Sequence, residues 1–223
     1  MDPGDINSTH IALIPKCKNP ATQKDFRPIS LCNVVMKMVS KTIANCIKKI
    51  LSEIVDGEQS GFVSDRLITD NALVSMECFH WLKKKKGNRG VLALKLDMSK
   101  AYDRLEWPFV VEPSRGFTPK RGLRQGDPFS LYLFIICVDV LSSFLKKEAL
   151  EKRIHGIQVA RQEPVITHLI FADESLLFSR ATCQETDKIM TTLKSYQLSS
   201  GQVVNLDKSE VSFSQNVHKR IEL

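Results

Sequence analysis

The spacing of hydrophobic residues changes several times along the chain, and each change predicts a different kind of element. The apolar run at residues 10–15 ends at Pro15, and a polar stretch with basic residues separates it from residues 26–29. This pattern predicts a hairpin with a basic tip. From Ser30 onward the apolar spacing becomes helical, and Gly57 lies just past the expected end of that helix. With Ser30 as the N-cap, the apolar stripe of this helix comprises Leu31, Val35, Met38, Ile43, Ile47, Ile50 and Ile54.

The central part of the chain predicts one strand between two helices. Residues 90–98 are apolar at nearly every position, which indicates a strand in a sheet covered on both faces. Before it, a helix from Asp70 to Gly87 ends in four lysines, which suit the negative end of a helix dipole. Its inward positions are Leu73, Met76, Phe79 and Leu82. After the strand, residues 129–146 predict a strongly apolar helix with a stripe of Leu133, Ile136, Cys137, Val140, Leu141 and Phe144.

A second hairpin is predicted in the last third of the chain. Residues 165–171 and 175–178 read as two short strands on either side of Ala172, Asp173 and Glu174. Both carboxylates are therefore expected at a turn.

The C-terminal part predicts one more helix and one more strand. Thr182 and Glu185 have the spacing of a capping box, and the helix that they open ends at Ser200 and Gly201. A final strand covers about residues 211–214. Since helices and strands follow one another in mixed order, the predicted fold class is α+β.

Composition narrows the class of protein without identifying it. The 223 residues suffice for one domain or two small ones, and 43% hydrophobic with 26% charged residues excludes a disordered chain. A net charge of +7 favours a polyanionic partner, although many globular proteins are mildly basic without one. The six cysteines contain no C-x-x-C pair, which excludes the common metal and redox motifs. The longest apolar run is seven residues and the N-terminus has no signal-peptide pattern, so we expect neither secretion nor a membrane partner.

Two isolated acidic sites carry the chemical signal. Asp97 ends the apolar strand, and the pair Asp173 and Glu174 occupies the hairpin tip. A carboxylate beside a core is costly unless something pairs with it, and Mg²⁺ is one candidate partner. Two such ions would stabilise the attacking and leaving oxygens of phosphoryl transfer. A solvated turn and a strand cap explain the same residues equally well, so spacing alone leaves both interpretations open.

A family resemblance adds to this interpretation. Five blocks, in order and over nearly the whole chain, resemble plant non-LTR (LINE-type) retrotransposon reverse transcriptases. The blocks are R-P-I-S-L (27–31), L-D-M-S-K-A-Y-D-R (96–104), R-G-L-R-Q-G-D-P (121–128), F-A-D-E-S-L-L-F (171–178) and S-G-Q-V-V-N-L-D-K-S (200–209).

The resemblance implies the fingers and palm of a right-hand polymerase, with the thumb absent. It places fingers at 1–89, palm at 90–215 with an internal deletion near 108–120, and a truncated tail at 216–223. The implied activity is RNA-directed DNA polymerisation by two-metal nucleotidyl transfer, with Mg²⁺, or alternatively Mn²⁺, as cofactor. The implied partners are an RNA template, a DNA primer and dNTP, and the implied compartment is the nucleus or cytoplasm. Nothing in the sequence indicates an oligomeric state.

The same resemblance assigns the catalytic and metal-binding residues. Asp97 and Asp173 match the two metal-binding aspartates, and Glu174 stands in the last position of the motif usually written F-A-D-D. The extra methylene of Glu174 moves its carboxylate outward by about 1 Å, and misplacements of that order can lower a rate by about 10²-fold.

Seven further residues are implied to bind the nucleotide. Tyr102 matches the aromatic residue that excludes a 2′-OH, and Gln125 with Gly126 match the loop that contacts nucleotide and template. Taken alone, Tyr102 is equally a core tyrosine and each lysine a solvated surface charge. The residues implied to neutralise the triphosphate or to assist pyrophosphate departure are Lys16, Lys24, Arg27 and Lys208.

The deletion leads us to expect an impaired polymerase. Residues 108–120 contain three prolines and are too short to supply the helix and strands that the family has there. The alternatives are an inactive remnant that retains only non-specific nucleic-acid binding, or a degenerate product that folds poorly. The sequence does not decide between them.

Overall fold

The computed structural model describes residues 9–99, 101–106 and 122–217. The segment expected to carry the deletion, near 108–120, and residues 218–223 of the expected tail lie outside these ranges. The strands are β1 (Thr9–Pro15), β2 (Phe26–Cys32), β3 (Val91–Asp97), β4 (His168–Phe171), β5 (Glu174–Arg180) and β6 (Glu210–Phe213). The helices are η1 (Gln23–Asp25), α2 (Val34–Ile54), α3 (Ile68–Lys84), α4 (Ala101–Arg104), α6 (Pro128–Leu150), α7 (Cys183–Ser200) and η2 (Leu206–Lys208).

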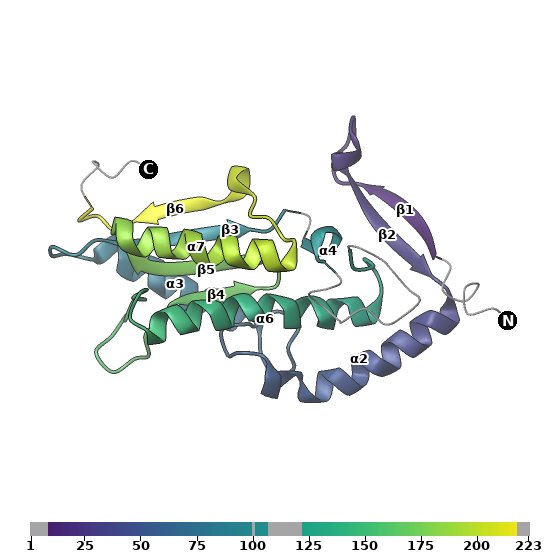
Figure 1. The fold of residues 1–223 in the computed structure, drawn as a ribbon, viewed down its shortest axis with the longest axis horizontal. Helices are drawn as coiled ribbons and strands as arrows, with labels where there is room; N and C mark the ends of the chain where they lie inside the picture. The colour runs from purple at the N-terminus through teal and green to yellow at the C-terminus, as the bar shows by residue number, and fades with distance from the viewer. Residues whose placement is uncertain (1–8, 100, 107–121, 218–223) are drawn as a thin grey trace.

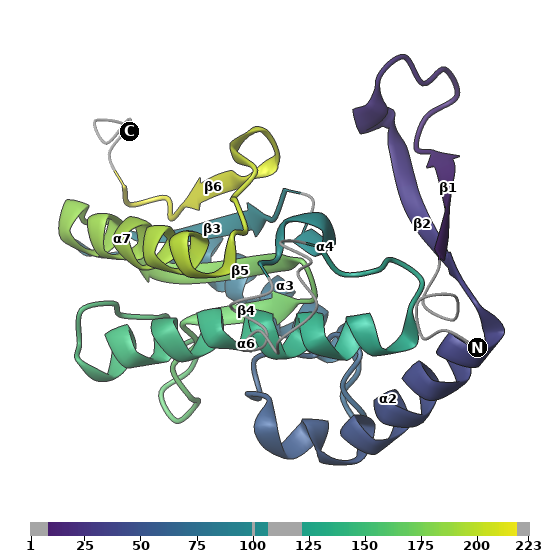
Figure 2. The ribbon, with the colours of Figure 1, turned by 45° about the vertical axis from the view of Figure 1, so that its right-hand side comes forward.

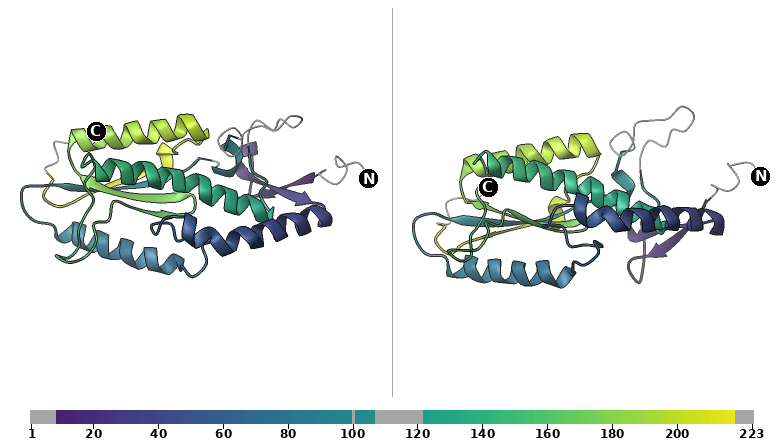
Figure 3. Two further views of the ribbon diagram at one scale, coloured as in Figure 1. Left: turned by 60° about the horizontal axis from the view of Figure 1, so that its bottom comes forward. Right: turned by 90° about the horizontal axis from the view of Figure 1, so that it is seen from below.

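A four-stranded antiparallel sheet, in the order β4-β5-β3-β6, forms the centre of the molecule (Figure 1). The helices α6 and α7 cover one face and α3 covers the other, as Figure 3 shows. Side chains of β3 therefore alternate between two apolar clusters: Leu96 packs toward α6 and α7, while Val91 and Ala93 pack toward α3. This confirms the prediction that residues 90–98 form a strand covered on both faces.

The helix α6 is the longest element and contributes to two hydrophobic clusters. Its buried residues Phe134 and Leu141 pack on the sheet, whereas Tyr132 and Ile135 pack on α2. By length and composition alone α6 is able to cross a membrane, but half of its most apolar stretch is buried inside the molecule. Packing on two sides accounts for its apolar sequence as that of a core helix.

The strands β1 and β2 form a separate two-stranded hairpin that projects beside the N-terminal end of α2 (Figures 1 and 2). The predicted hairpin is thus confirmed, but β2 continues through Cys32, so Ser30 is not the helix N-cap. Asn33 is the N-cap instead, and its side chain accepts a hydrogen bond from the Val35 backbone N–H at 3.0 Å.

The buried side of α2 differs from the apolar stripe found in its sequence. The residues that contact α6 and its surroundings are Ser40, Ala44 and Leu51. Five members of the predicted stripe are at least 42% exposed, namely Val35, Met38, Ile43, Ile50 and Ile54. The helix is therefore present as expected, but most of its apolar surface faces outward.

The helix α3 shows a smaller difference of the same kind. It begins at Ile68, two residues before the predicted start, and the predicted inward residues Leu73 and Met76 are 65% and 67% exposed. Leu82 is buried as expected, and Cys78 is buried beside it. Propensity and spacing located this helix, but its rotation about its axis depends on how it packs on the sheet.

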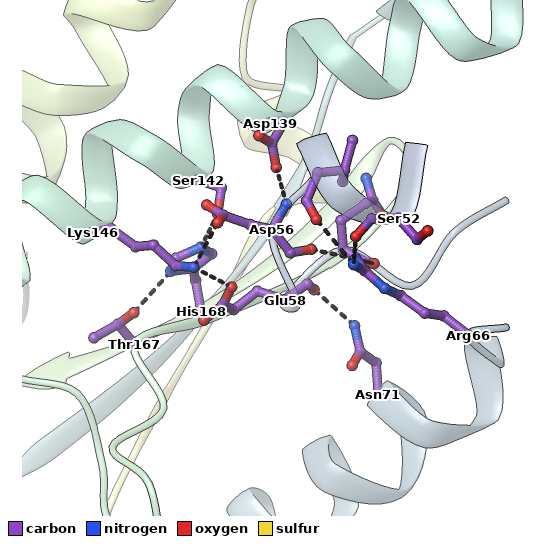
Figure 4. A network of polar contacts seen from close by, with 12 residues as sticks. Ser52, Asp56, Glu58, Arg66, Asn71, Asp139, Ser142, Lys146, Thr167 and His168 are labelled. Atoms are coloured by element: carbon purple, nitrogen blue, oxygen red, sulfur yellow. Dashed lines mark hydrogen bonds and ion pairs between the residues drawn. The ribbon is translucent and has the colours of Figure 1, made fainter. Parts of the chain in front are cut away.

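A buried polar network anchors the segment after α2 against α6 and β4 (Figure 4). Lys146 forms ion pairs with Asp56 at 2.8 Å and with Glu58 at 2.7 Å. Burial raises the pKa of Asp56, but the bonds from Lys146 and Ser142 outweigh burial and leave this pKa below its usual value. The Asp56 carboxylate is consequently charged and paired at neutral pH.

His168 lies at the inner end of this network and is fully buried at the start of β4. The Ser142 hydroxyl donates to Asp56 at 3.0 Å, so its oxygen is left to accept from His168 Nε2–H at 2.7 Å. His168 Nδ1 then accepts from the Thr167 hydroxyl at 2.8 Å. Burial lowers the pKa of His168 to about 4, so the ring is neutral, and every one of its polar atoms is satisfied.

Candidate active site

A cleft of about 1330 Å³ lies between the β1–β2 hairpin and the end of the four-stranded sheet. It draws its lining from six parts of the chain that are far apart in sequence. Lining residues from these parts include Lys16, Arg27, Asp97, Tyr102, Gln125, Gly126, Asp173 and Lys208. Eight of the ten residues predicted to form the site therefore lie in one cleft.

Asp97 is positioned by the last segment of the chain. It is the final residue of β3, and its carboxylate accepts a hydrogen bond from the Asn205 side chain at 3.1 Å. The Asn205 backbone N–H also donates to the Asp97 carbonyl oxygen at 2.8 Å. The Ser209 hydroxyl accepts from the Asp97 backbone N–H at 3.4 Å. These contacts hold both the backbone and the side chain of Asp97 at the rim of the cleft.

Asp173 lies in the two-residue turn between β4 and β5. Phe171 pairs with Glu174, which leaves Ala172 and Asp173 as the turn, and Ala172 has a positive φ of 58°. A positive φ at the first turn residue alone is the pattern of a type II′ turn, which matches the twist of a hairpin. The predicted hairpin is confirmed, and Asp173 lines the cleft from its tip.

Tyr102 forms part of the floor of the cleft. It lies in the short helix α4, and its ring stacks on Phe134 with a centroid distance of 4.5 Å. Burial, and next the nearby charge of Asp173, raise the pKa of Tyr102 to about 12. The phenol is therefore neutral, and its electrostatic response to Asp173 shows that the two side chains are neighbours.

Glu174 is placed differently from the two aspartates. It begins β5 opposite Asp97, but it is not among the residues that line the cleft. Its carboxylate lies 3.5 Å from Lys95 Nζ, and both side chains are about half exposed. In this arrangement Lys95 accounts for the Glu174 charge, and a metal-binding role for Glu174 stays a prediction.

The loop at Gln125 and Gly126 joins the hairpin to the sheet. The Ser30 backbone N–H of β2 donates to the Gln125 carbonyl oxygen at 2.7 Å, and the Gln125 side chain donates to Asp103 at 3.1 Å. Gly126 has a φ of +100°, and a Cβ there would lie 3.2 Å from the Ser30 carbonyl oxygen. Glycine is thus required both by the backbone conformation and by the close approach of β2.

The basic residues that were predicted to bind phosphate divide into two groups. Lys16 and Arg27 reach the cleft from the hairpin, and Lys208 reaches it from η2 on the opposite side. Lys24 belongs to η1, but its side chain lies outside the part of the chain that the structure describes. Cations thus face the two aspartates from both sides of the cleft.

The donor set suits a hard divalent cation. Asp97 and Asp173 present carboxylate oxygens to an open, water-accessible cleft, and Mg²⁺ is commonly held by one or two carboxylates together with substrate phosphates. Among the described residues, no group of three or more acidic, histidine or cysteine side chains is placed to hold a metal. The residues therefore fit an ion whose remaining ligands are water and phosphate, rather than a closed protein cage.

Several residues that support the site were not identified from the sequence pattern. Asn205 and Ser209 lie within a quoted motif, yet nothing in their spacing indicated that they hold Asp97. Asp103 and Lys95 have the same standing, because their partners are set by strand register and loop packing. A polar residue one to three positions from a predicted site residue, within the same motif, is the available signal.

Comparison with known families identifies the chain. The family model described as reverse transcriptase (RNA-dependent DNA polymerase) matches residues 14–219, so the chain belongs to the reverse transcriptase family. Two retrotransposon proteins place it within the LINE-type branch. It is 22% identical over 230 residues to the transposon TX1 149 kDa protein of Xenopus laevis, which covers 89% of this chain and 17% of that protein. It is 26% identical over 209 residues to the Pol polyprotein of the R2DM retrotransposable element of Drosophila melanogaster, covering 79% of this chain and 18% of that protein.

Solved structures support the same fold. The apo telomerase of Candida tropicalis, truncated from its C-terminal domain, has a TM-score of 0.56 at 16% identity and covers 95% of this chain and 51% of that one. The telomerase of Candida albicans with a telomeric RNA fragment has a TM-score of 0.58 at 14% identity, with 98% and 45% coverage. The fold is thus the α+β palm and fingers of a reverse transcriptase. The chain spans about half or less of the length of the proteins it matches.

Proposed function

We propose that this chain acts as an RNA-directed DNA polymerase domain of a plant LINE-type retrotransposon, with an RNA template, a DNA primer and dNTP as partners. The observation that carries the proposal is the cleft in which Asp97, Asp173 and Tyr102 meet the basic residues of the hairpin. A segment of 58 residues that is 52% identical to an uncharacterized mitochondrial protein of Arabidopsis thaliana supports the plant origin. We assign residues 1–89 to the fingers and 90–215 to the palm, with nuclear or cytoplasmic work.

The residues of the cleft divide the reaction between them. Asp97 and Asp173 would hold Mg²⁺, or Mn²⁺, and the bound ion would supply charge stabilisation for the attacking and leaving oxygens of nucleotidyl transfer. Arg27 binds triphosphate oxygens through its planar fork, and Lys16 adds a point charge from the same hairpin. Lys208 neutralises the departing pyrophosphate from the opposite side. Positioning and charge neutralisation account for most of the rate in this kind of chemistry.

Tyr102 sets the sugar preference in this proposal. Its ring is held by stacking on Phe134 and faces Asp173, so a 2′-OH on the incoming nucleotide would meet the aromatic face. Tyr102→Ala should raise ribonucleotide incorporation about tenfold or more relative to dNTP, whereas Tyr102→Phe should keep the discrimination. Equal sugar discrimination in Tyr102→Ala and wild type would remove this role.

The activity itself is tested by dNTP incorporation on a primed RNA template with Mg²⁺ or Mn²⁺. We expect weak incorporation that Asp173→Asn abolishes, with Asp187→Asn, on the surface of α7, as the matched control. Incorporation that is equal in wild type and Asp173→Asn would show that the cleft is not the source of activity.

A second candidate function is nucleic-acid binding without catalysis. The pairing of Glu174 with Lys95 favours it, because this pairing leaves two carboxylates in the cleft where the family motif has three. It would give binding that falls steeply with salt, without sequence preference, and that Asp173→Asn does not weaken. Absence of incorporation together with such binding would favour this function over polymerisation.

A further inference from the structure

The segment at residues 58–60 completes the edge of the sheet beside the Asp173 turn. β4 is an edge strand, and its outer side is occupied by a parallel bridge between Gln59 and Ile170. The Ile170 backbone N–H donates to the Glu58 carbonyl oxygen at 2.9 Å, and the Ser60 N–H donates to the Ile170 carbonyl oxygen at 3.3 Å. This short segment therefore lies against the last residues of β4 before the turn begins.

The Gln59 side chain reaches the turn itself. It is fully buried, and its Oε1 accepts hydrogen bonds from the Ala172 backbone N–H at 3.3 Å and from the Gly61 N–H at 2.9 Å. Because both neighbours are donors, the amide oxygen must face them, which fixes the orientation of the amide group. The Ala172 N–H points away from the hairpin ladder, so a side-chain acceptor from outside the hairpin is what satisfies it.

Two other residues hold Gln59 and the turn together. A Cβ on Gly61 would lie 2.9 Å from the Ala172 backbone nitrogen, so a larger residue there would displace the turn. The Asn71 side-chain amide of α3 donates to the Glu58 carbonyl oxygen at 2.8 Å and to the Ile170 carbonyl oxygen at 3.3 Å. The contact between the 58–61 segment and the hairpin is thus fixed from both sides.

Ala172 needs such support because of its backbone conformation. Its φ of 58° lies in the left-handed region, where a residue with a Cβ is strained and glycine is the usual occupant. Asp173 follows directly, so the direction of its carboxylate depends on Ala172 keeping this conformation. A relaxed Ala172 would rotate the turn and move Asp173 relative to Asp97.

We propose that Gln59 is a positioning residue for Asp173, acting by holding Ala172 in the left-handed conformation through its side-chain oxygen. The inference rests on the proposed function, in which Asp97 and Asp173 share a divalent cation. It adds a residue to the site that no motif match assigned and that does not itself line the cleft.

The test compares Gln59→Met, which keeps the side-chain length and removes the acceptor, with wild type. Mn²⁺ serves as the probe, and the signal of the unbound ion in electron paramagnetic resonance gives its affinity, with Asp173→Asn as reference. We expect Gln59→Met to weaken Mn²⁺ binding about 10- to 100-fold, which is the usual effect of removing support from a metal ligand. Adding Ala172→Gly to Gln59→Met should restore most of the affinity, because glycine adopts the turn without help.

The matched control is Thr192→Val in α7, which also removes one buried side-chain hydrogen bond but lies away from the turn. It should leave Mn²⁺ affinity within twofold of wild type. Unchanged Mn²⁺ affinity in Gln59→Met, or equal weakening in Thr192→Val, would overturn the proposal, because a general loss of stability would then explain the result.

Hydrogen exchange separates this proposal from the proposed function. The Ala172 amide should be protected in wild type, although turn amides usually exchange quickly, and Gln59→Met should lower its protection at least tenfold. An unprotected Ala172 amide in wild type overturns the proposal even if Gln59→Met does not fold. If wild type shows no Mn²⁺ binding that depends on Asp173, the proposed metal site fails, while the exchange result still decides whether Gln59 holds the turn.

Discussion

The four-stranded sheet and the region formed by β1, β2 and α2 use apolar residues in opposite ways. In β5 the five consecutive residues from Ser175 to Ser179 are buried, because helices cover both faces of the sheet. In β1 the residues Ile11, Leu13 and Ile14 are more than half exposed. The two regions have similar apolar sequences, but only one of them has elements on both sides to cover it.

This difference shows what an apolar pattern measures. In the sheet it reports burial within this chain, and the predicted strands agree with the structure. In α2 the same kind of pattern marks an outward surface, while the small residues Ser40 and Ala44 make the close contact with α6. The apolar pattern thus predicts where surface leaves water only when enough chain is available to cover it.

The largest expected effect is on the stability of the sheet. Phe178 of β5 is fully buried in the cluster beneath α3, so Phe178→Ala should lower the free energy of unfolding by about 3–5 kcal/mol. Val39→Ala, on the 49% exposed side of α2, should change it by less than about 0.5 kcal/mol. Urea denaturation followed by circular dichroism measures both. A similar loss for Val39→Ala would mean that the α2 surface is covered in solution.

The next effect is a dependence of stability on pH that belongs to the sheet region. His168 has a folded-state pKa of about 4 against 6.5 when unfolded, so the unfolded chain takes up the proton first as pH falls. The stabilising contribution is fully present above pH 6.5 and is lost as pH falls from 6.5 toward 4. The loss should be on the order of 3 kcal/mol.

The matched control for this effect is His10, which is exposed in β1. His168→Asn should remove most of the pH dependence between 6.5 and 4, and His10→Asn should leave it unchanged. Equal pH dependence in wild type and His168→Asn would assign the effect to other groups.

A smaller effect is expected where the two regions join. Gly126→Ala places a Cβ on a residue with φ of +100° and 3.2 Å from the Ser30 carbonyl oxygen, so it should cost about 1–2 kcal/mol. Gly57→Ala, with open space around it and no positive φ, should cost less than about 0.5 kcal/mol. Thermal unfolding distinguishes them, and equal shifts would mean that the contact between β2 and the Gln125 loop is not maintained.

The smallest effect concerns the exposed ion pair beside the cleft. Lys95→Gln removes the partner of Glu174, and because both side chains are about half exposed, solvent screening limits the loss of stability to about 0.5 kcal/mol. Chemical denaturation of Lys95→Gln and of Lys194→Gln, on α7, should give closely similar values. A loss above about 1 kcal/mol for Lys95→Gln alone would mean that the pair is more shielded from water than the structure indicates.

Local signals in the sequence predicted the elements well, and the reasons are physical. Strands β3 and β5 are recognisable because covered strands are apolar at most positions, and α7 is recognisable from Thr182 at its N-cap and Gly201 with φ of +74° at its end. The rotation of α2 and α3 was not predictable in this way, because their apolar residues outnumber the positions that neighbouring elements cover.

The candidate site divides along the same line. Motif matches located Asp97, Asp173 and Tyr102, and the structure brings these residues into one cleft. The motif position of Glu174 did not reveal its pairing with Lys95, which follows from the register of β3 and β5. Contacts between segments more than a hundred residues apart, such as Asn205 with Asp97, have no local signal at all.

The position of β6 has a consequence for how the chain is made. β3 lies between β5 and β6, and the residues that hold Asp97 come from the segment at 205–209. During synthesis at about 5–20 residues per second, β3 leaves the ribosome roughly ten seconds before β6 is available to pair with it. Throughout that interval β3 has an unpaired edge and Asp97 lacks its partners, so the metal-binding end of the sheet is the last part of the molecule to form, and a chaperone that shields β3 would act in this interval.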